Sequence, residues 1–327
     1  MSVYVVTGGA GFIGSSIVQR LVLEGDYVRV VDDLSTGRRD NLGALQGEVN
    51  FFEGSVCNAD LLRDAFEGAD YVLHQAALAS VQGSMDDPIK TNEVNVGGTL
   101  TVLTVARECG VKRVVYASSS SVYGTGPAQP KREDMMLAPA SPYAVSKLVG
   151  EHYCSAYHSL FGLETVCLRY FNVFGPRQDP HSPYAAAIPI FIRAILEGGR
   201  PRVYGDGEQS RDFVFVEDVA DANLRAARIP GAAGAVLNIG SGGRCTVNEL
   251  LGLLKRLTGK AVEPEYCPAR PGDVRHSQAD IAMAQRVIGY RPRVSFEDGL
   301  RRAEEWYEGK DATTFYLPGP KAEQGRG

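Results

Sequence analysis

The sequence lacks the features that define several large classes of protein. No apolar run approaches the roughly 20 residues that a membrane-spanning helix needs, and the six cysteines show neither a CxxC pair nor a regular spacing. We therefore expect no membrane partner, no metal site, and reduced, mostly buried thiols in a cytoplasmic protein. Because the first residues already read as a strand, we also expect no cleavable leader.

The sequence also lacks an excess of basic charge. The net charge of −5 and the absence of a basic stripe argue against a nucleic-acid partner. Apolar residues make up 44% of the chain and charged residues 22%, which is ordinary for a globular protein. With 327 residues, the chain can fold into one large or two modest domains with a sizeable core.

Glycine, in contrast, is concentrated in one short segment near the N-terminus. A β-branched apolar run at residues 3–6 is typical of a buried parallel strand, and TGGAGFIG follows at residues 7–14, before a helical pattern. Gly8, Gly11 and Gly14 let the backbone approach a pyrophosphate, to which the helix N-terminus offers its N–H groups. The segment predicts a dinucleotide site, with a tight turn that holds no nucleotide as the alternative.

Two acidic residues follow the second predicted strand, at residues 27–31. Asp32 and Asp33 can accept hydrogen bonds from the adenosine ribose hydroxyls and would repel a 2′-phosphate. Arg38 and Arg39 lie in the next turn and leave NADP open. We predict NAD as the cofactor.

Tyr143 and Lys147 form the second informative pattern. Positions four apart share one face of a helix, so the phenol and the ammonium point into the same space. A free tyrosine has a pKa of about 10, and a nearby cation lowers the pKa by favouring the phenolate. The pair predicts a proton acceptor beside the nucleotide; two surface side chains that meet by chance are the alternative.

Strand-like and helix-like segments alternate through the first half of the chain. This alternation predicts an α/β fold, a Rossmann-type doubly wound parallel sheet, with ligands beyond the C-terminal ends of the strands. The expected strands are residues 49–52, 71–74, 114–117 and 165–168, and the expected helices are residues 59–66, 92–109 and 144–160.

The pattern changes near residue 175, where a segment rich in proline and glycine begins. We expect a nucleotide-binding Rossmann domain at residues 1–175, to whose sheet residues 213–242 return. Residues 176–212 and 243–310 should form a smaller, mixed C-terminal domain for the substrate, followed by a poorly ordered tail at 311–327.

These motifs together resemble the extended short-chain dehydrogenase/reductase superfamily, and within it the NAD-dependent nucleotide-sugar epimerases and dehydratases. The resemblance runs from Val3 to about Trp306. It is carried by TGGAGFIG, DDLSTG, HQAA, NVGGT, YASSSSVYG, YAVSK, RYFNVFGPRQ, RDFVFVEDVA and NIGSG.

The resemblance implies roles for three catalytic residues. Tyr143 would be the general base, and Lys147 would bind the nicotinamide ribose and lower the pKa of Tyr143. Ser119 would hydrogen-bond the sugar hydroxyl that is oxidised; it matches the family's serine by its offset from Tyr123, although other serines surround it.

It also implies two sets of binding residues. The cofactor set is Gly8, Gly11, Phe12, Ile13, Gly14, Asp32, Asp33, Ser55, Val56, Ala76, Ala77, Asn95, Tyr143, Lys147 and Tyr170. The substrate set is Ala79, Ser80, Ser119, Ser120, Asn172, Ala186, Arg211, Arg270, Asp273 and Ser277. Ser55 stands where the family usually has an aspartate at the adenine, which weakens the expectation for cofactor affinity.

Absences narrow the reaction within the family. Dehydratases and decarboxylases carry carboxylates just before the VYG motif, where this chain has Ser119, Ser120 and Ser121. Without them only a hydride and one proton can move, which suits a 4-epimerase acting through a transient 4-keto sugar. Ser277, at the position that limits the C2 substituent, and Ala79, in place of a lysine, favour UDP-N-acetylhexosamines together with UDP-glucose and UDP-galactose.

Three alternatives stay open. Arg177 or Arg275 could bind a sugar carboxylate, which would favour UDP-glucuronate 4-epimerisation. A reductase that exchanges its cofactor, or a nucleotide-sensing protein without activity, could use the same fold. The family further implies a homodimer through the helices at 92–109 and 144–160, although their apolar faces could equally belong to the core.

Overall fold

The structure is a computed structural model, and it describes residues 1–180, 186–269 and 274–309. Within these residues a seven-stranded sheet has the order β11-β6-β5-β4-β1-β2-β3, and each neighbouring pair is parallel. Its strands are β1 (Val3–Thr7), β2 (Tyr27–Asp32), β3 (Val49–Glu53), β4 (Tyr71–His74), β5 (Arg113–Ser119), β6 (Glu164–Tyr170) and β11 (Val236–Ile239). The doubly wound Rossmann-type sheet predicted from the sequence is confirmed.

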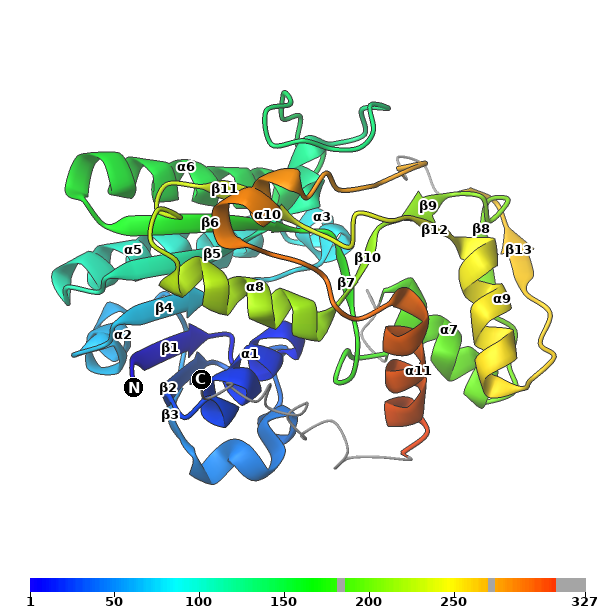
Figure 1. Cartoon of the computed structure of the whole chain (residues 1–327), viewed down its shortest axis with the longest axis horizontal. Coiled ribbons are helices and arrows are strands. Elements are labelled where there is room, and N and C mark those ends of the chain that lie inside the picture. The colour runs from blue at the N-terminus through cyan, green and yellow to red at the C-terminus, as the bar shows by residue number, and fades with distance from the viewer. Residues whose placement is uncertain (181–185, 270–273, 310–327) are drawn as a thin grey trace, which may run out of the picture.

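Helices cover both faces of this sheet (Figure 1). On one face, α1 (Phe12–Leu23), α8 (Val216–Arg228) and α10 (Ala282–Ile288) pack into one apolar cluster with the strands. On the other face, α2 (Ala59–Phe66), α5 (Gly98–Glu108) and α6 (Pro142–Phe161) form a second cluster. The strands are buried from both sides, which accounts for their continuous apolar character.

Helix α6 has clear start and stop signals. Ser141 is the N-cap, its hydroxyl accepts a hydrogen bond from the backbone N–H of Ala144 at 3.2 Å, and Pro142 occupies the first turn. Gly162 ends the helix in the left-handed conformation. Tyr143 therefore lies in the first turn, and Lys147 lies one turn further along the same face.

The remaining elements lie to the right of the sheet in Figure 1 or connect its strands and helices. A third apolar cluster joins α7 (Ala187–Leu196), α9 (Val247–Thr258) and α11 (Phe296–Tyr307) to short strands. These strands pair as β7 (Asn172–Phe174) with β10 (Phe213–Phe215), β8 (Arg202–Tyr204) with β13 (Glu265–Cys267), and β9 (Ser210–Arg211) with β12 (Cys245–Thr246). The short connecting helices are η1 (Arg39–Gly47), α3 (Val81–Asp86), α4 (Pro88–Asn92), η2 (Glu93–Gly97) and η3 (Ser120–Tyr123).

The segment 213–242 divides its strands between two sheets. β11 pairs with β6 at the edge of the large sheet, whereas β10 pairs with β7. The division into domains at residue 175 stays a prediction, and the tail at 311–327 lies outside the described residues. Nowhere in the described ranges is a helix both long and apolar enough to cross a membrane.

Candidate active site

The glycine-rich turn between β1 and α1 brings three segments into close contact. Gly8 has a φ of 68°, and a Cβ on it would lie 2.7 Å from the backbone nitrogen of Ala76. A Cβ on Gly14 would lie 2.0 Å from the carbonyl oxygen of Gly8. Neither position can carry a side chain in this backbone conformation, because real atoms do not approach so closely.

Helix α1 begins directly at this turn, next to Phe12 and Ile13. Its N-cap is Gly11, and no side chain caps the helix N-terminus. The N–H groups of a first turn need partners, and together with the positive end of the helix dipole they suit an anion. The turn therefore fits the pyrophosphate of a dinucleotide.

Asp32, at the end of β2, stabilises this turn through hydrogen bonds. One carboxylate oxygen accepts a hydrogen bond from the backbone N–H of Ala10 at 2.9 Å, and the other accepts from that of Leu34 at 2.8 Å. Burial raises the pKa of Asp32, and these two hydrogen bonds oppose that effect. Asp33 is exposed and accepts from the backbone N–H of Ser35 at 3.0 Å. Both carboxylates thus lie where the chain leaves β2, beside the turn.

Tyr143, Lys147 and Ser119 meet beyond the C-terminal end of β5. Ser119, the last residue of that strand, hydrogen-bonds the hydroxyl of Tyr143. The Lys147 ammonium is buried and donates to the carbonyl oxygen of Ala117 at 2.8 Å. It lies 5.9 Å from the ring centroid of Tyr143 and 5.1 Å from that of Tyr116. The three side chains converge on one place.

Burial dominates the electrostatics of this group. Burial raises the pKa of Tyr143, and the hydrogen bond with Ser119 lowers it by less. Burial also lowers the pKa of Lys147 to about 8. In the protein alone, removal of the phenol from water outweighs its favourable contacts, and the expectation that Lys147 lowers the pKa of Tyr143 stays a prediction.

The structure separates the serines of the YASSSSVYG motif. Ser118 donates to the carboxylate of Glu151, which is itself paired with Arg169 at 2.7 Å in the core. Ser120 begins η3, and its neighbour Ser121 has a buried hydroxyl without a hydrogen-bond partner among the described residues. Among the four serines of this motif, Ser119 is the one that hydrogen-bonds the Tyr143 phenol; its catalytic role stays a prediction.

Two predicted cofactor residues, Asn95 and Tyr170, form hydrogen bonds within the protein. The Asn95 amide accepts from the backbone N–H of Leu78 at 2.8 Å and donates to the hydroxyl of Ser146 at 3.0 Å, so it fixes the chain after β4 against α6. Tyr170 is hydrogen-bonded to Gln75 and Asn223. Their roles at the cofactor stay predictions.

The other predicted cofactor residues lie near the strand ends. Ala76 and Ala77 follow β4, where the backbone of Ala76 approaches Gly8. Ser55 and Val56 follow β3; the Ser55 hydroxyl accepts from the backbone N–H of Cys57 at 3.2 Å, and Val56 is buried. Their roles also stay predictions.

Some of the predicted substrate residues lie on adjoining segments. Asn172 donates through its side chain to the carbonyl oxygen of Asp212 at 3.1 Å, next to Arg211. The backbone N–H of Ser277 donates to the carbonyl oxygen of Ser210 at 3.0 Å, so Ser277 and Arg211 lie on neighbouring chains.

The rest of the substrate set is dispersed or not described. Ala79 and Ser80 precede α3, where the Ser80 hydroxyl caps the helix, and Ala186 is the N-cap of α7. Arg270 and Asp273 lie outside the described residues.

Two arginines that could have bound a sugar carboxylate are engaged with the protein. Arg177 donates to the side chains of Ser16 and Gln19 in α1, at 2.9 Å each. Arg275 forms a two-point ion pair with Asp206, at 2.7 and 2.9 Å. These contacts weaken the case for a glucuronate substrate.

Asp212 is an important residue that sequence reasoning missed. Its buried carboxylate accepts from the backbone N–H groups of Ser241, Gly242 and Ala279, and from the Ser241 hydroxyl. Asp212 thus connects the substrate-side segments that contain Arg211 and Ser277 to the turn after β11. Its position within the RDFVFVEDVA motif was the available signal.

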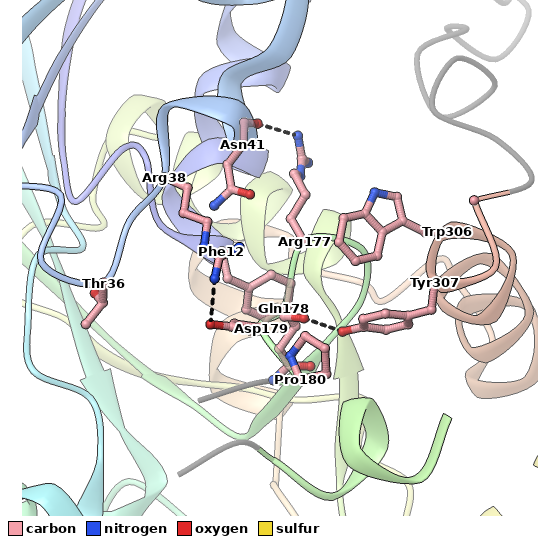
Figure 2. A pocket seen from close by; sticks show the side chains of 11 residues that line it. Phe12, Thr36, Arg38, Asn41, Arg177, Gln178, Asp179, Pro180, Trp306 and Tyr307 are labelled. Carbon is pink, nitrogen blue, oxygen red and sulfur yellow. Dashed lines mark hydrogen bonds and ion pairs between the residues drawn. The ribbon is translucent and has the colours of Figure 1, made fainter. Parts of the chain in front are cut away.

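A cavity of about 330 Å³ beside α1 was also not predicted. Figure 2 shows it between Phe12 of α1 and the side chains of Trp306 and Tyr307 of α11. Besides Phe12, its lining comes from three segments far apart in the sequence: Thr36, Arg38 and Asn41; Arg177, Gln178, Asp179 and Pro180; and Trp306, Tyr307 and Gly309. In the described ranges, no group of three histidine, cysteine or acidic residues could hold a metal ion.

Comparison with known proteins agrees with this geometry. Residues 4–240 match the model of the NAD dependent epimerase/dehydratase family. The UDP-glucose 4-epimerase of Mycolicibacterium smegmatis is 42% identical over 310 residues, which cover 93% of this chain and 98% of that protein.

Solved structures show the same likeness. The UDP-N-acetylglucosamine 4-epimerase from Methanobrevibacter ruminantium, in complex with UDP-N-acetylmuramic acid, superposes with a TM-score of 0.91 at 40% identity, covering 95% of this chain and 99% of the other. The UDP-glucose 4-epimerase from Thermus thermophilus, in complex with NAD, gives a TM-score of 0.86 at 38% identity, covering 94% and 99%.

A parallel sheet with a glycine-rich turn and a Ser-Tyr-Lys group defines a dinucleotide-dependent enzyme of the short-chain dehydrogenase/reductase type. The chain belongs to the NAD-dependent epimerase/dehydratase family. It is an NAD-dependent epimerase, an isomerase whose cofactor is NAD.

Proposed function

We propose that the protein is a UDP-hexose 4-epimerase that interconverts UDP-GlcNAc and UDP-GalNAc, and also UDP-glucose and UDP-galactose, through a transient 4-keto sugar. The observation that carries this proposal is the contact of Ser119 with Tyr143 at the end of β5, next to Ser120 and Ser121 where other members have carboxylates. One hydroxyl acid–base pair is enough for epimerisation, whereas elimination or decarboxylation requires further acid–base groups.

In the proposed reaction, Ser119 and Tyr143 hold the O4 hydroxyl of the sugar. Tyr143 takes the O4 proton as the C4–H bond breaks, and it returns the proton to O4 after the sugar has turned over. NAD, when bound, would supply the hydride acceptor and donor, and its positive nicotinamide ring would favour the phenolate. Lys147, whose ammonium donates to the carbonyl oxygen of Ala117, would bind the nicotinamide ribose.

The remaining binding roles belong to the same proposal. Asn172 and Arg211, with Arg270 and Asp273, would hold the uridine diphosphate, because guanidinium groups match phosphate in charge and geometry. Ser277 and Ala79 would leave room for an N-acetyl group at C2. All six cysteines are free, which supports a cytoplasmic location. Helices α5 and α6 would form a homodimer interface.

A substrate panel tests the proposal. The purified protein is mixed, without added NAD, with UDP-glucose, UDP-GlcNAc or UDP-glucuronate, and the anomeric protons are followed by NMR. We expect the appearance of UDP-GalNAc and UDP-galactose, and no turnover of UDP-glucuronate. Turnover of UDP-glucuronate alone would contradict the proposed substrate, and retention of all three sugars, even with added NAD, would contradict the proposed activity.

A further inference from the structure

The cavity in Figure 2 adjoins the expected position of the adenosine ribose. The chain after β2 folds back over the carboxylate of Asp32, so closely that a Cβ on Gly37 would lie 2.8 Å from one of its oxygens. The backbone N–H of Arg38 then donates to the carbonyl oxygen of Ala10 at 2.9 Å. Arg38 is thereby fixed between the ribose-binding carboxylate and the pyrophosphate-binding turn.

Such a position would suit recognition of a 2′-phosphate, because a guanidinium is the usual partner of that group in enzymes that use NADP. The Arg38 guanidinium instead crosses the cavity to the carboxylate of Asp179, at 3.4 Å. Its neighbour Arg39 is also engaged, with Glu53 at 2.6 Å and over the ring of Phe51 at 4.0 Å.

The segment that carries Asp179 is held firmly in place. Arg177 ties it to Ser16 and Gln19 of α1, and the hydroxyl of Tyr307 in α11 donates to the carbonyl oxygen of Gln178 (Figure 2). The carboxylate therefore faces Arg38 from a fixed support and not from a free loop.

We propose that Asp179 determines cofactor specificity by pairing with Arg38, so that the enzyme takes NAD and disfavours NADP. A bound 2′-phosphate would have to draw Arg38 away from Asp179 and would meet a second negative charge near Asp32. NAD has no such phosphate and leaves the pair intact. The proposal concerns the cofactor alone and does not depend on which sugar is the substrate.

The test compares the nucleotides that the chain binds while it folds. Wild type and variants are made by cell-free synthesis with NAD and NADP at equal concentration, separated from free nucleotide, and extracted for chromatography. Asp179→Asn should raise the ratio of bound NADP to bound NAD about two- to fivefold, the size expected for one solvent-exposed ion pair. Asp179→Ser should act in the same way.

Two further variants make the result specific. In the double variant Arg38→Gln/Asp179→Asn the ratio should return to the wild-type value, because no guanidinium is released. Asp60→Asn, which removes a carboxylate from an exposed ion pair with Arg63 on α2, should leave the ratio unchanged. An unchanged ratio in both single Asp179 variants, at normal total nucleotide, would overturn the proposal, as would a rise that persists in the double variant.

Discussion

The Ser119 hydroxyl and the Tyr143 phenol are the two groups on which the proposed chemistry depends most directly. Their contact places a hydrogen-bond partner beside a phenol whose pKa burial has raised. The raised pKa keeps Tyr143 protonated at neutral pH, so its action as a base needs positive charge nearby. Lys147 and the oxidised nicotinamide would supply that charge only in the assembled site.

Replacement of Tyr143 by phenylalanine should abolish most of the activity. Loss of a general acid–base group typically lowers rates by about 100- to 10,000-fold, so kcat/KM should fall by at least about 100-fold. Thermal unfolding should change little, because the ring is retained. Tyr153→Phe, on the same helix, serves as the matched control and should keep full activity; a normal rate for Tyr143→Phe would disprove the general-base role.

The activity should also fall in alkaline solution. The Lys147 ammonium has a pKa of about 8 in the structure, well below the ordinary value of 10.5, because of burial. It is charged below this pH and loses its proton above it, so both ribose binding and support of the phenolate weaken. A profile of kcat/KM against pH should show a descending limb near pH 8. A rate that still rises beyond pH 9 would contradict this role for Lys147.

Ser277 should control the choice of sugar. A tyrosine at this position would fill the space proposed for the N-acetyl group, and overpacking of a filled site typically costs about 1–3 kcal/mol. For Ser277→Tyr we expect kcat/KM with UDP-GlcNAc to fall at least about tenfold, whereas kcat/KM with UDP-glucose is retained. Equal losses for both sugars would place Ser277 outside the C2 pocket.

At the scale of elements, the turn from β1 into α1 leaves no room for added side chains. Gly14→Ala would drive a methyl group into the carbonyl oxygen of Gly8, 2.0 Å away. We expect the turn to shift, with loss of most bound NAD after purification and a lower melting temperature. In Gly252→Ala, within α9, the nearest described atom outside the adjacent helix backbone is Nη1 of Arg256, at 3.9 Å from the new methyl group, and this variant should keep its NAD. Full NAD content in Gly14→Ala would contradict the assignment of the turn.

The elements also show which features can be predicted from sequence. The turn, α6 and the parallel sheet follow from local patterns: spacing of glycines, a Ser-Pro helix start, and apolar runs. The pKa of Tyr143 could not be predicted, since it depends on burial by distant segments. Nor could the four hydrogen bonds of the Asp212 carboxylate, or the Arg38–Asp179 pair across 141 residues of chain, because neither leaves a periodic signal.

At the scale of the whole molecule, the proposed dimer can be tested by measuring the molar mass of the protein in solution. Helix α6 exposes the apolar side chains of Val145, Leu160 and Phe161. A partner subunit packed on this helix would remove them from water. Sedimentation equilibrium should give twice the chain mass of 35.2 kDa. A particle of one chain mass across the concentration range would show that these side chains remain exposed and would remove the dimer from the proposal.

The central claim is that a hydride leaves C4 of the sugar and returns to the opposite face. It is tested most directly with UDP-GlcNAc that carries deuterium at C4, incubated with the purified enzyme in ordinary water. The account predicts UDP-GalNAc that retains the deuterium at C4, because the hydride never mixes with solvent protons. UDP-GalNAc with hydrogen at C4, or a product in which another carbon is inverted, would contradict it.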